Sequence, residues 1–476
     1  MNIVKTLLEN CDQQKAAFII DDKVITYKNL LDQTEKYIYY FKTQKFDSSV
    51  LIFLPESLEF ISAVLACWCL DIPIFHPNPF LSKKTIEKMC KDTNTKFIIT
   101  NNNYEKKLRG INAKIIDLGS AQMPFAKHFH HDYPIHDSDK EIFYAISTGS
   151  TGESKLVPHT INNILAWSKI YSNVCNINKD SIIYTTSRMT FIWGFACSLF
   201  LNLYQKSTCI IDSKMATPKL MKHNIETYKP THFFTVPTFV DLLIKSKLDV
   251  DFSSVDLCMS SGDWLPEHFC HEFATKFNKT LVNAIGSSET VSNYTFTATH
   301  DTQNINSLGK PIESVQIKIM ENETECKIGE VGEIYVSAPF NSTRYLNHSD
   351  ALTYENGWIK TKDLGYFNSN GSLVYMGRKN FIFKIHGQFV NPIEVEKEIL
   401  TYPGIENCIV KSVTKKGHLP KLAVDLLCSK NIDIADLKIY LGQKLEKINV
   451  PKIYNIVEKI NTTWNGKKLR TIINAL

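Results

Sequence analysis

The amino-acid sequence predicts an α/β protein with a large N-terminal domain and a smaller α+β C-terminal domain. Three observations predict this class. Strand-length apolar runs alternate with helix-like stretches as far as about residue 309, which indicates several subdomains built on parallel sheets covered by helices. Short strands separated by Gly and Asn turns then indicate a small antiparallel β unit. After Arg378, a compact pattern of about a hundred residues is typical of a separate small domain.

Each region contributes its own expected elements. In the first region, strands are expected at 50–54, 96–100, 114–118, 143–146, 209–212 and 231–236, and helices at 27–41, 57–70 and 162–174. The antiparallel unit is expected to use strands at 315–320, 332–337 and 372–375. The C-terminal unit is expected to use helices at 393–400 and 434–444, with strands at 408–413 and 422–427.

Composition narrows the class of protein. The chain has 476 residues, 43% hydrophobic and 22% charged, which excludes disordered and fibrous classes. A net charge of +5 without a long basic block does not favour nucleic-acid binding. The longest apolar run, from Phe60 to Leu70, is too short to span a bilayer and is expected to form a buried helix. No signal peptide is expected at the N-terminus.

Twelve cysteines are scattered without any C-x-x-C pair, so zinc or disulfide frameworks are not expected. Reduced, mostly buried thiols are the simpler interpretation, and they suit a cytoplasmic location.

The segment from Ser147 to Lys155 reads STGSTGESK and is the most informative stretch. Its two glycines allow a tight turn close to an anion, while its hydroxyls and backbone N–H groups can donate to phosphate oxygens. Lys155 adds a positive charge. A solvated Ser/Gly turn is the alternative, but nine consecutive residues of this type are less common. The segment is not the nucleoside-triphosphatase loop, because no lysine follows Gly152 directly.

The order of this segment resembles the S/T-G-S/T-T-G-x-P-K signature of the adenylate-forming superfamily. That superfamily holds acyl- and aryl-CoA synthetases, adenylation domains of non-ribosomal peptide synthetases, and beetle luciferases. The usual proline is Ser154 here, a change expected to loosen the loop without abolishing binding.

Two further motifs follow in the family's order. The segment IGSSET, from Ile285 to Thr290, resembles the aromatic-G-x-T-E motif, in which the Glu ligates Mg²⁺ with ATP. A hard cation on triphosphate prefers oxygen ligands, and Glu289 supplies one. Ile285 stands where many members place an aromatic residue near adenine, and benzoate-type ligases are similarly aliphatic at this position. Upstream, SSGDWLP resembles S-x-G-E-x-L-P, with Asp263 in place of Glu.

The C-terminal motifs complete the resemblance. TKDLG resembles T-G-D-L-G, which implies that Asp363 accepts the ribose hydroxyls, and Lys362 stands in place of the family's glycine in this turn. GRKN with KIHG resembles G-R-x-D…K-x-x-G, which implies a ribose contact from the arginine and a hinge at Asn380. Asn tolerates unusual backbone angles nearly as well as Asp. WNGKKLR resembles the family ending, which implies that Lys467 bridges the acyl carboxylate and the α-phosphate.

The resemblance therefore implies a domain organisation and a set of site residues. Residues 1–377 are expected to form the adenylation core, 378–380 the hinge, and 381–476 a mobile lid. The expected catalytic residues are Lys155, Glu289 and Lys467, with Glu289 as the metal ligand. The expected ATP- and AMP-contacting residues are Thr148, Gly149, Ser150, Thr151, Gly152, Lys155, Gly262, Asp263, Ile285, Gly286, Ser288, Asp363, Arg378 and Lys467. Lys384 and Gly387 are expected to contact the thiol arm.

The acyl pocket is expected to include Phe191, Ile192, Trp193, Gly194, Ala284 and Asn293. Amino-acid-activating members place an Asp in this region, and the stretch from Tyr184 to Tyr204 has no acidic residue. The aromatic–small–aromatic pattern resembles benzoate-type CoA ligases, so an aromatic or short unsaturated acid is favoured. Simple core packing of this stretch is the alternative.

The chain is thus expected to be an AMP-forming acid–thiol ligase that uses ATP, Mg²⁺ and CoA, with a small carboxylic acid as substrate. Three alternatives remain. A stand-alone ligase would load the phosphopantetheine of an acyl carrier protein. A luciferase-like oxidase would need a special substrate. A catalytically inactive nucleotide-binding homologue gains slight support from Ser154, Lys362 and Asn380.

Overall fold

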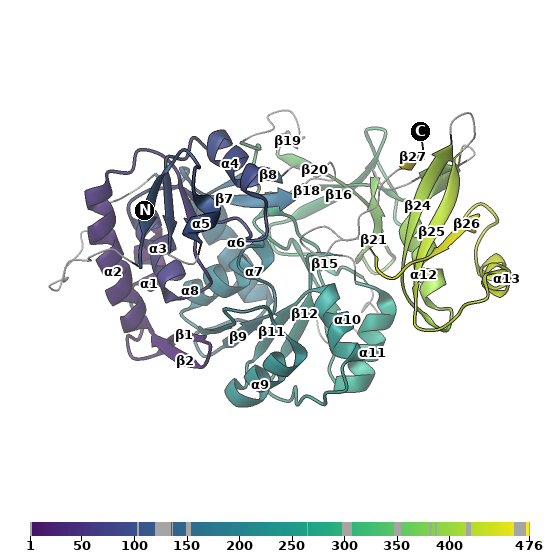
Figure 1. The fold of residues 1–476 in the computed structure, drawn as a ribbon, viewed down its shortest axis with the longest axis horizontal. Helices are drawn as coiled ribbons and strands as arrows, with labels where there is room; N and C mark the ends of the chain where they lie inside the picture. Colours follow the sequence, from purple (N-terminus) through teal and green to yellow (C-terminus); the bar gives the residue numbers. More distant parts are fainter. Residues whose placement is uncertain are drawn as a thin grey trace. The chain divides into compact units, whose positions relative to one another are not determined.

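The structure is a computed structural model, and it describes 2–101, 104–119, 135, 137–148, 154–263, 265–297, 307–346, 354–379, 383–385, 388–415, 420–460 and 473–475. For 148, 354, 383, 384, 388, 389, 414, 415 and 473–475 it describes the backbone alone. The chain forms two compact units: Met1–Gln316 with Val336–Ile359, and Ile317–Tyr335 with Lys360–Leu476. Figure 1 labels their helices and strands.

The first sheet carries the predicted phosphate segment. Its order is β6 (Lys114–Asp117), β5 (Phe97–Thr100), β3 (Val50–Phe53), β4 (Ile74–Phe75), β7 (Glu141–Thr148) and β8 (Ser154–Thr160). The strands are parallel except for the antiparallel pair β7–β8. That pair ends with Thr148 opposite Ser154, so its two strands flank residues 149–153.

The second sheet has the order β13 (Leu281–Asn283), β12 (Leu257–Ser260), β11 (His232–Thr235), β9 (Ile182–Thr185), β10 (Thr208–Ile211), β1 (Ala16–Ile20) and β2 (Lys23–Thr26). It is parallel except for the β1–β2 hairpin. Helices α9 (Pro218–Tyr228), α10 (Pro237–Lys245) and α11 (Glu267–Phe277) pack on it through one buried apolar cluster (Figure 1).

The longer helices of this unit begin at recognisable capping residues. Thr26 and Thr160 form capping boxes with the asparagines three residues later, at the starts of α2 (Tyr27–Gln44) and α6 (Ile161–Val174). Ser57 caps α3 (Leu58–Cys69), whose residues from Phe60 onward are all buried. The remaining helical segments are α1 (Ile3–Leu8), α4 (Lys83–Asp92), α5 (Glu105–Leu108), α7 (Ile192–Phe195), the π-helical η1 (Ala196–Leu201), α8 (Asn202–Gln205) and the 3₁₀ turn η2 (Ser288–Thr290).

Two smaller groups of strands follow along the chain. Strands β14 (Thr295–Phe296) and β15 (Lys310–Pro311) pair antiparallel. A further sheet has the order β17 (Thr324–Glu325), β16 (Gln316–Glu321), β18 (Gly332–Ser337), β20 (Trp358–Phe367) and β19 (Tyr354–Glu355), with β21 (Leu373–Arg378) antiparallel to β20.

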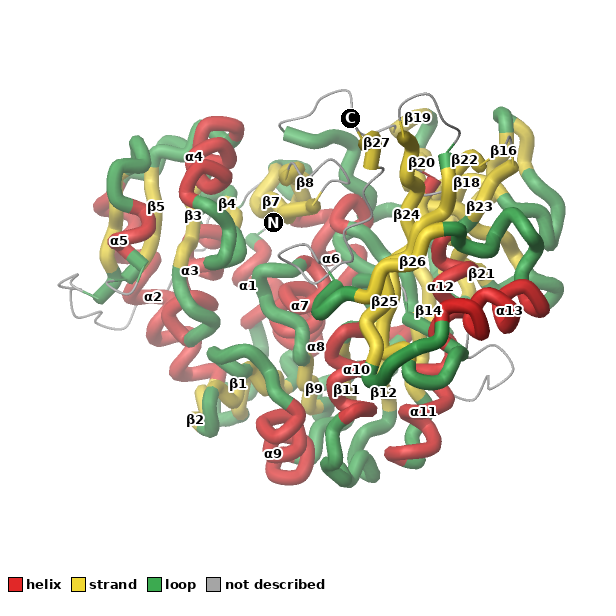
Figure 2. Tube along the Cα trace, turned by 45° about the vertical axis from the view of Figure 1, so that its right-hand side comes forward, coloured by secondary structure: helices red, strands yellow, loops and turns green. Residues whose placement is uncertain are grey.

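The C-terminal part has its own sheet and core. The sheet order is β26 (Ile453–Ile456), β25 (Lys421–Cys428), β24 (Ile405–Lys415) and β27 (Ile473–Ala475). Figure 2 shows β24, β25 and β26 side by side with α12 (Pro392–Leu400) and α13 (Ile434–Lys444). Buried residues of both helices share one apolar cluster with this sheet. A short hairpin, β22 (Phe383–Ile385) with β23 (Gln388–Val390), precedes α12.

The predicted fold class is confirmed, and every expected helix and strand is present within a few residues of its expected bounds. The β1–β2 hairpin was not predicted. Strand β1 joins the second sheet beside β10, about 190 residues later in the chain, and local periodicity carries no signal of that pairing. Of the residues expected in the adenylation core, 317–335 and 360–377 group with the C-terminal part, and the predicted domain boundaries stay a prediction. The hinge at 378–380 therefore stays a prediction.

The structure also bears on two further expectations, those about membrane-spanning helices and about cysteines. Among the helices described, none combines the length and the apolar character required to cross a membrane. All twelve cysteines are free, and nine of them are buried, in line with the predicted reduced thiols.

Candidate functional site

The predicted phosphate segment is described at its two ends. Gly149, Ser150, Thr151 and Gly152 lie outside the described residues, and Thr148 is described by its backbone alone. Lys155 lies on β8 opposite Ser147 of β7. Its ammonium nitrogen lies 4.6 Å from the centre of the Tyr345 ring, a cation–π distance.

The predicted magnesium ligand lies against the same tyrosine. Glu289 is the middle residue of η2. The Tyr345 hydroxyl donates a hydrogen bond of 2.5 Å to Oε1 of Glu289. The backbone N–H of Ser342 donates to the Glu289 carbonyl oxygen at 2.7 Å. Tyr345 therefore contacts both a cation and a carboxylate that the sequence predicts to act on ATP, and sequence analysis missed it because the three residues are far apart in the chain.

The backbone around Glu289 is held in an uncommon conformation. Val291, fully buried, has φ 59° and ψ −52°, which costs a β-branched residue roughly 1–3 kcal/mol. Gly286 pairs with Asn293 across this turn. A Cβ added at Gly286 would lie 2.4 Å from the Ser292 carbonyl oxygen, so the close approach requires glycine. These contacts hold the turn that carries Glu289.

His159 supports the same turn from β8. Its fully buried ring donates through Nε2 to the Ser288 carbonyl oxygen at 2.7 Å. Burial lowers the pKa of His159 to about 4, so the ring is neutral near pH 7. A donor to a backbone carbonyl inside an apolar environment fixes the position of Ser288, one residue before Glu289.

Gly262 and Asp263, which the resemblance places near adenine, lie in an exposed turn. Gly262 has φ +91°, a conformation that side chains rarely adopt, and Asp263 beside it is exposed. Ile285 is half-buried, and its N–H donates to Thr295 Oγ1 at 3.1 Å. Ala284 is buried.

The predicted acyl segment is closely packed. Trp193 is 4% exposed, and its Nε1 donates to the Thr235 carbonyl oxygen at 3.2 Å. A Cβ on Gly194 would lie 2.2 Å from the Arg188 carbonyl oxygen. Core packing therefore explains Trp193 and Gly194, whereas Phe191 and Ile192 are half-buried and keep surface for another contact.

Asn293, predicted as a polar contact for a ring substituent, is 2% exposed. Its Oδ1 lies 2.6 Å from the Ser261 hydroxyl, and its Nδ2 donates to the Tyr171 hydroxyl at 3.0 Å. The Trp167 indole donates to its carbonyl oxygen at 2.9 Å. These partners fix the amide, so a substrate contact would require this network to rearrange.

In the second unit, Asp363 and Arg378 face each other across β20 and β21. Arg378 Nε lies 3.0 Å from Asp363 Oδ1, and the Tyr375 hydroxyl donates to the same oxygen at 3.3 Å. Asp363 is 6% exposed. An arginine and a tyrosine on one oxygen orient the carboxylate strongly.

The replacement of glycine by Lys362 is accommodated in the backbone. Lys362 has φ +63°, the left-handed conformation that glycine adopts most easily. Its N–H donates to Glu333 Oε1 at 3.2 Å, and Lys379 Nζ lies 2.9 Å from Glu333 Oε2. Glu333, which sequence analysis also missed, links the turn before Asp363 to Lys379, within the predicted hinge segment 378–380.

The structure gives little information on the predicted hinge, thiol-arm and C-terminal lysine residues. Asn380, Gly387 and Lys467 lie outside the described residues. Lys384 is described by its backbone, paired with Phe389 in the β22–β23 hairpin.

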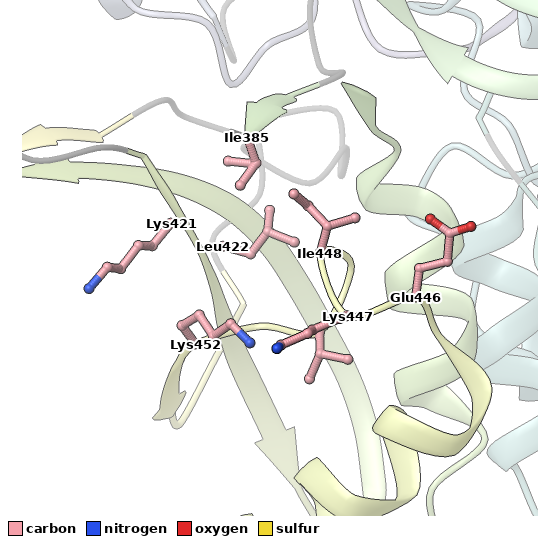
Figure 3. Close-up of a pocket in the computed structure, with 8 residues that line it drawn as sticks. Ile385, Lys421, Leu422, Glu446, Lys447, Ile448 and Lys452 are labelled. Atoms are coloured by element: carbon pink, nitrogen blue, oxygen red, sulfur yellow. The ribbon is translucent and has the colours of Figure 1, made fainter. Parts of the chain in front are cut away.

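A pocket of about 460 Å³ lies beside that hairpin, within the C-terminal part. Its lining residues are Ile385, Lys421, Leu422, Glu446, Lys447, Ile448, Val450 and Lys452. In the view of Figure 3, Ile385, Leu422 and Ile448 gather together, with the amino groups of Lys447 and Lys452 below them. The apolar side chains, together with three lysines and one glutamate, make this pocket suitable for an anion that also has an apolar part.

The donor set fits a magnesium ion that arrives with a nucleotide. In the described part of the chain, no three His, Cys, Asp or Glu residues gather as a metal-binding group. Mg²⁺ is commonly held by one or two carboxylates together with substrate phosphates. Glu289, beside the predicted phosphate segment, meets that requirement as a single carboxylate.

Comparison with known proteins gives the family. Residues 8–346 match the family model described as AMP-binding enzyme. The chain is 25% identical over 467 residues to a 2-succinylbenzoate–CoA ligase of Bacillus licheniformis, covering 96% of each chain. It is 26% identical over 350 residues to a 3-hydroxybenzoate–CoA ligase of Aromatoleum sp. strain CIB, covering 70% of this chain. That match spans 66% of the relative's length, and the match to a benzoate–CoA ligase of Thauera aromatica spans 64%.

Solved structures confirm the fold. The o-succinylbenzoate CoA synthetase from Bacillus subtilis, with its acyl-adenylate, superposes with a TM-score of 0.90 at 22% identity over 98% of this chain and 97% of that one. An anthranilate CoA ligase with anthranoyl-AMP gives 0.87 at 19% identity over 98% and 96%. The match to the family model covers well over half of the sequence, and the chain therefore belongs to the AMP-binding enzyme family.

Proposed function

We propose that this chain is an ATP- and Mg²⁺-dependent acid–thiol ligase that converts a carboxylic acid to its acyl-AMP, with release of pyrophosphate, and transfers the acyl group to CoA. The observation that carries the proposal is the arrangement around Tyr345. There the predicted phosphate lysine, Lys155, and the predicted magnesium ligand, Glu289, contact one side chain, and Lys155 stands on β8 opposite Ser147.

The proposed chemistry depends on charge and position. A carboxylate must approach the α-phosphate, and two anions repel each other, so fixed cations have to stabilise the developing charge. Lys155 supplies one such charge and Lys467 is proposed to supply another. Mg²⁺, held by Glu289, would neutralise phosphate charge when bound. The acid is already ionised near neutral pH, so no general base is required.

The acid is proposed to be aromatic. The absence of an acidic residue from Tyr184 to Tyr204 disfavours an amino acid. The half-buried Phe191 and Ile192 offer an apolar surface. The relatives named above act on benzoate-type acids, which supports the same class.

CoA is proposed as the acceptor. The lysine-lined pocket beside the β22–β23 hairpin suits the phosphates of CoA, and Lys384 and Gly387 of that hairpin region are the proposed thiol-arm contacts. Asp363 and Arg378 are proposed to bind ribose. Rotation about Asn380 is proposed to exchange Lys467 for the thiol-arm face between the two half-reactions. A cytoplasmic location is part of the same proposal.

The test is carboxylate-dependent exchange of pyrophosphate into ATP with Mg²⁺, across benzoates, cinnamates, fatty acids and amino acids. Exchange with benzoates or cinnamates is the expected outcome. Exchange with amino acids alone would contradict the proposed acid class. ATP binding without exchange across a broader panel would favour a catalytically inactive homologue.

Lys467→Ala is expected to abolish most of the exchange, while Lys468→Ala, its neighbour of the same charge, serves as the matched control. Wild-type formation of acyl-AMP by Lys467→Ala would refute the role of that lysine.

A further inference from the structure

We propose that Tyr345 is the positioning residue for Glu289: it orients the carboxylate for Mg²⁺ and keeps that carboxylate and the Lys155 ammonium in separate places. This inference rests on the proposed function, because it takes Glu289 as the magnesium ligand. Tyr345 itself is not proposed to contact substrate.

The contacts of Tyr345 use its two chemically different parts. Its hydroxyl donates to Oε1 of Glu289 at 2.5 Å. Its ring face receives the Lys155 ammonium, 4.6 Å from the ring centre. Tyr345 is 7% exposed, so both contacts are shielded from bulk water and are stronger than they would be at the surface.

The segment that carries Tyr345 is attached on both sides. Before it, the Ser342 N–H donates to the Glu289 carbonyl oxygen at 2.7 Å. After it, the Leu346 N–H donates to the Leu156 carbonyl oxygen at 2.9 Å, next to Lys155 on β8. The tyrosine is therefore fixed relative to both charged groups, as a positioning residue must be.

A neutral donor is the appropriate partner for a carboxylate that must bind a cation. The hydrogen bond to Oε1 holds the carboxylate without neutralising it, so Oε2 can turn toward a metal ion. The ring face likewise holds an ammonium without neutralising it. Without the tyrosine, the opposite charges of Lys155 and Glu289 would attract each other, and a direct ion pair would compete with Mg²⁺ for Glu289 and with phosphate for Lys155.

Tyr345→Phe separates the two roles, because it keeps the ring and removes the hydroxyl. Loss of a group that orients a metal ligand typically lowers metal affinity by 10- to 100-fold. We therefore expect the Mg²⁺ concentration that half-saturates tight ATP binding to rise about tenfold in Tyr345→Phe. Tyr345→Leu, which also removes the ring, is expected to weaken ATP binding in the absence of Mg²⁺ as well.

The experiment measures ATP binding by calorimetry over a range of Mg²⁺ concentrations, so no knowledge of the acid is required. Tyr228→Phe is the matched control: the Tyr228 hydroxyl donates to Asp22 Oδ1 at 2.6 Å, a similar pair on the surface. Thermal melting checks that all variants fold. An unchanged Mg²⁺ requirement in folded Tyr345→Phe would overturn the inference.

Glu289→Gln distinguishes this inference from the proposed function. A raised Mg²⁺ requirement in both Glu289→Gln and Tyr345→Phe supports the inference. If Glu289→Gln raises it and Tyr345→Phe does not, the positioning role fails alone. If Glu289→Gln leaves it unchanged, the assignment of the metal ligand fails, and the inference fails with it.

Discussion

Arg378 and Asp363 form an ion pair across adjacent antiparallel strands, with Nε of the arginine 3.0 Å from Oδ1 of the aspartate. The resemblance predicts both residues as ribose contacts, and they lie fifteen positions apart in the chain, on two strands joined by a turn. Their pairing holds the Asp363 carboxylate in one orientation, so binding of ribose hydroxyls would not require it to be ordered first.

Asp363→Ala is expected to weaken ATP binding. Hydrogen bonds to a charged group contribute about 1.5–3 kcal/mol, which corresponds to a 10- to 150-fold rise in the KM for ATP. The wild-type protein should discriminate against 2′-deoxy-ATP, and the variant should not. Tyr375→Phe removes the longer 3.3 Å hydrogen bond to Asp363 and should change the KM for ATP less than about threefold. Equal KM values for wild type and Asp363→Ala would contradict the ribose assignment.

Lys362→Gly is expected to leave the protein as stable or to stabilise it by up to about 1 kcal/mol. A left-handed conformation costs an L-residue roughly 1–2 kcal/mol, and glycine avoids most of that cost while losing more backbone entropy. Lys360→Gly, two residues earlier on β20, should instead destabilise by about 0.5–1 kcal/mol, because glycine weakens a strand. Thermal melting compares the two variants, and the same sign of change in both would contradict the structural account of Lys362.

Gly194→Ala and Gly286→Ala are both expected to destabilise the protein and to lower ligase activity. Their added methyl groups would lie 2.2 Å and 2.4 Å from backbone oxygens, and overpacking costs about 1–3 kcal/mol. Gly442→Ala is the matched control, because nothing lies within 4 Å of its Cβ position and it sits in helix α13. Alanine is favoured over glycine in helices by about 1 kcal/mol, so this control should melt at the same temperature or higher.

Acidification is expected to destabilise the protein through its buried histidines. Burial lowers the pKa of His159 and of His76 from 6.5 to about 4. Below pH 6.5 the unfolded chain binds protons that the folded protein does not, so stability falls as the pH drops from 6.5 toward 4. One histidine accounts for about 3 kcal/mol over that window.

His159→Gln should remove part of this pH dependence, because glutamine does not titrate. Its amide can still donate to the Ser288 carbonyl oxygen, so the contact is kept. The measurement is the free energy of unfolding at pH 7 and at pH 5 for both proteins. A pH dependence of equal size in His159→Gln would show that His159 does not titrate as its burial implies.

Charge reversal in the lysine-lined pocket is expected to act on the second half-reaction alone. The double variant Lys447→Glu with Lys452→Glu should raise the KM for CoA by about tenfold, through repulsion of its phosphates, while pyrophosphate exchange stays unchanged. Lys430→Glu, an exposed lysine outside the pocket lining, is the control. An unchanged KM for CoA in the double variant would favour an acceptor that binds elsewhere, such as a carrier protein.

Much of the fold was predictable because local patterns of apolar and polar residues indicate its helices and strands. The periodicity of residues 27–41 and 162–174 predicted α2 and α6, and the threonines before each helix fix where it begins. The β1–β2 hairpin was missed because its place depends on pairing with β10, which no local pattern encodes. Lys155, Glu289, Asp363 and Arg378 could be predicted because their motifs follow one another in the family's order, which is visible in the sequence alone.

The sequence by itself determined the class of the fold, the family and the chemical types of the site residues, because residue type, spacing and order are local or one-dimensional. Only the tertiary structure decided which side chains hold those residues in place. Tyr345 meets Glu289 and Lys155, and Glu333 supports the turn at Lys362, through contacts between distant segments. It also decided that Trp193, Gly194 and Asn293 are bound within the core, since burial and hydrogen-bond partners exist only after the chain has folded.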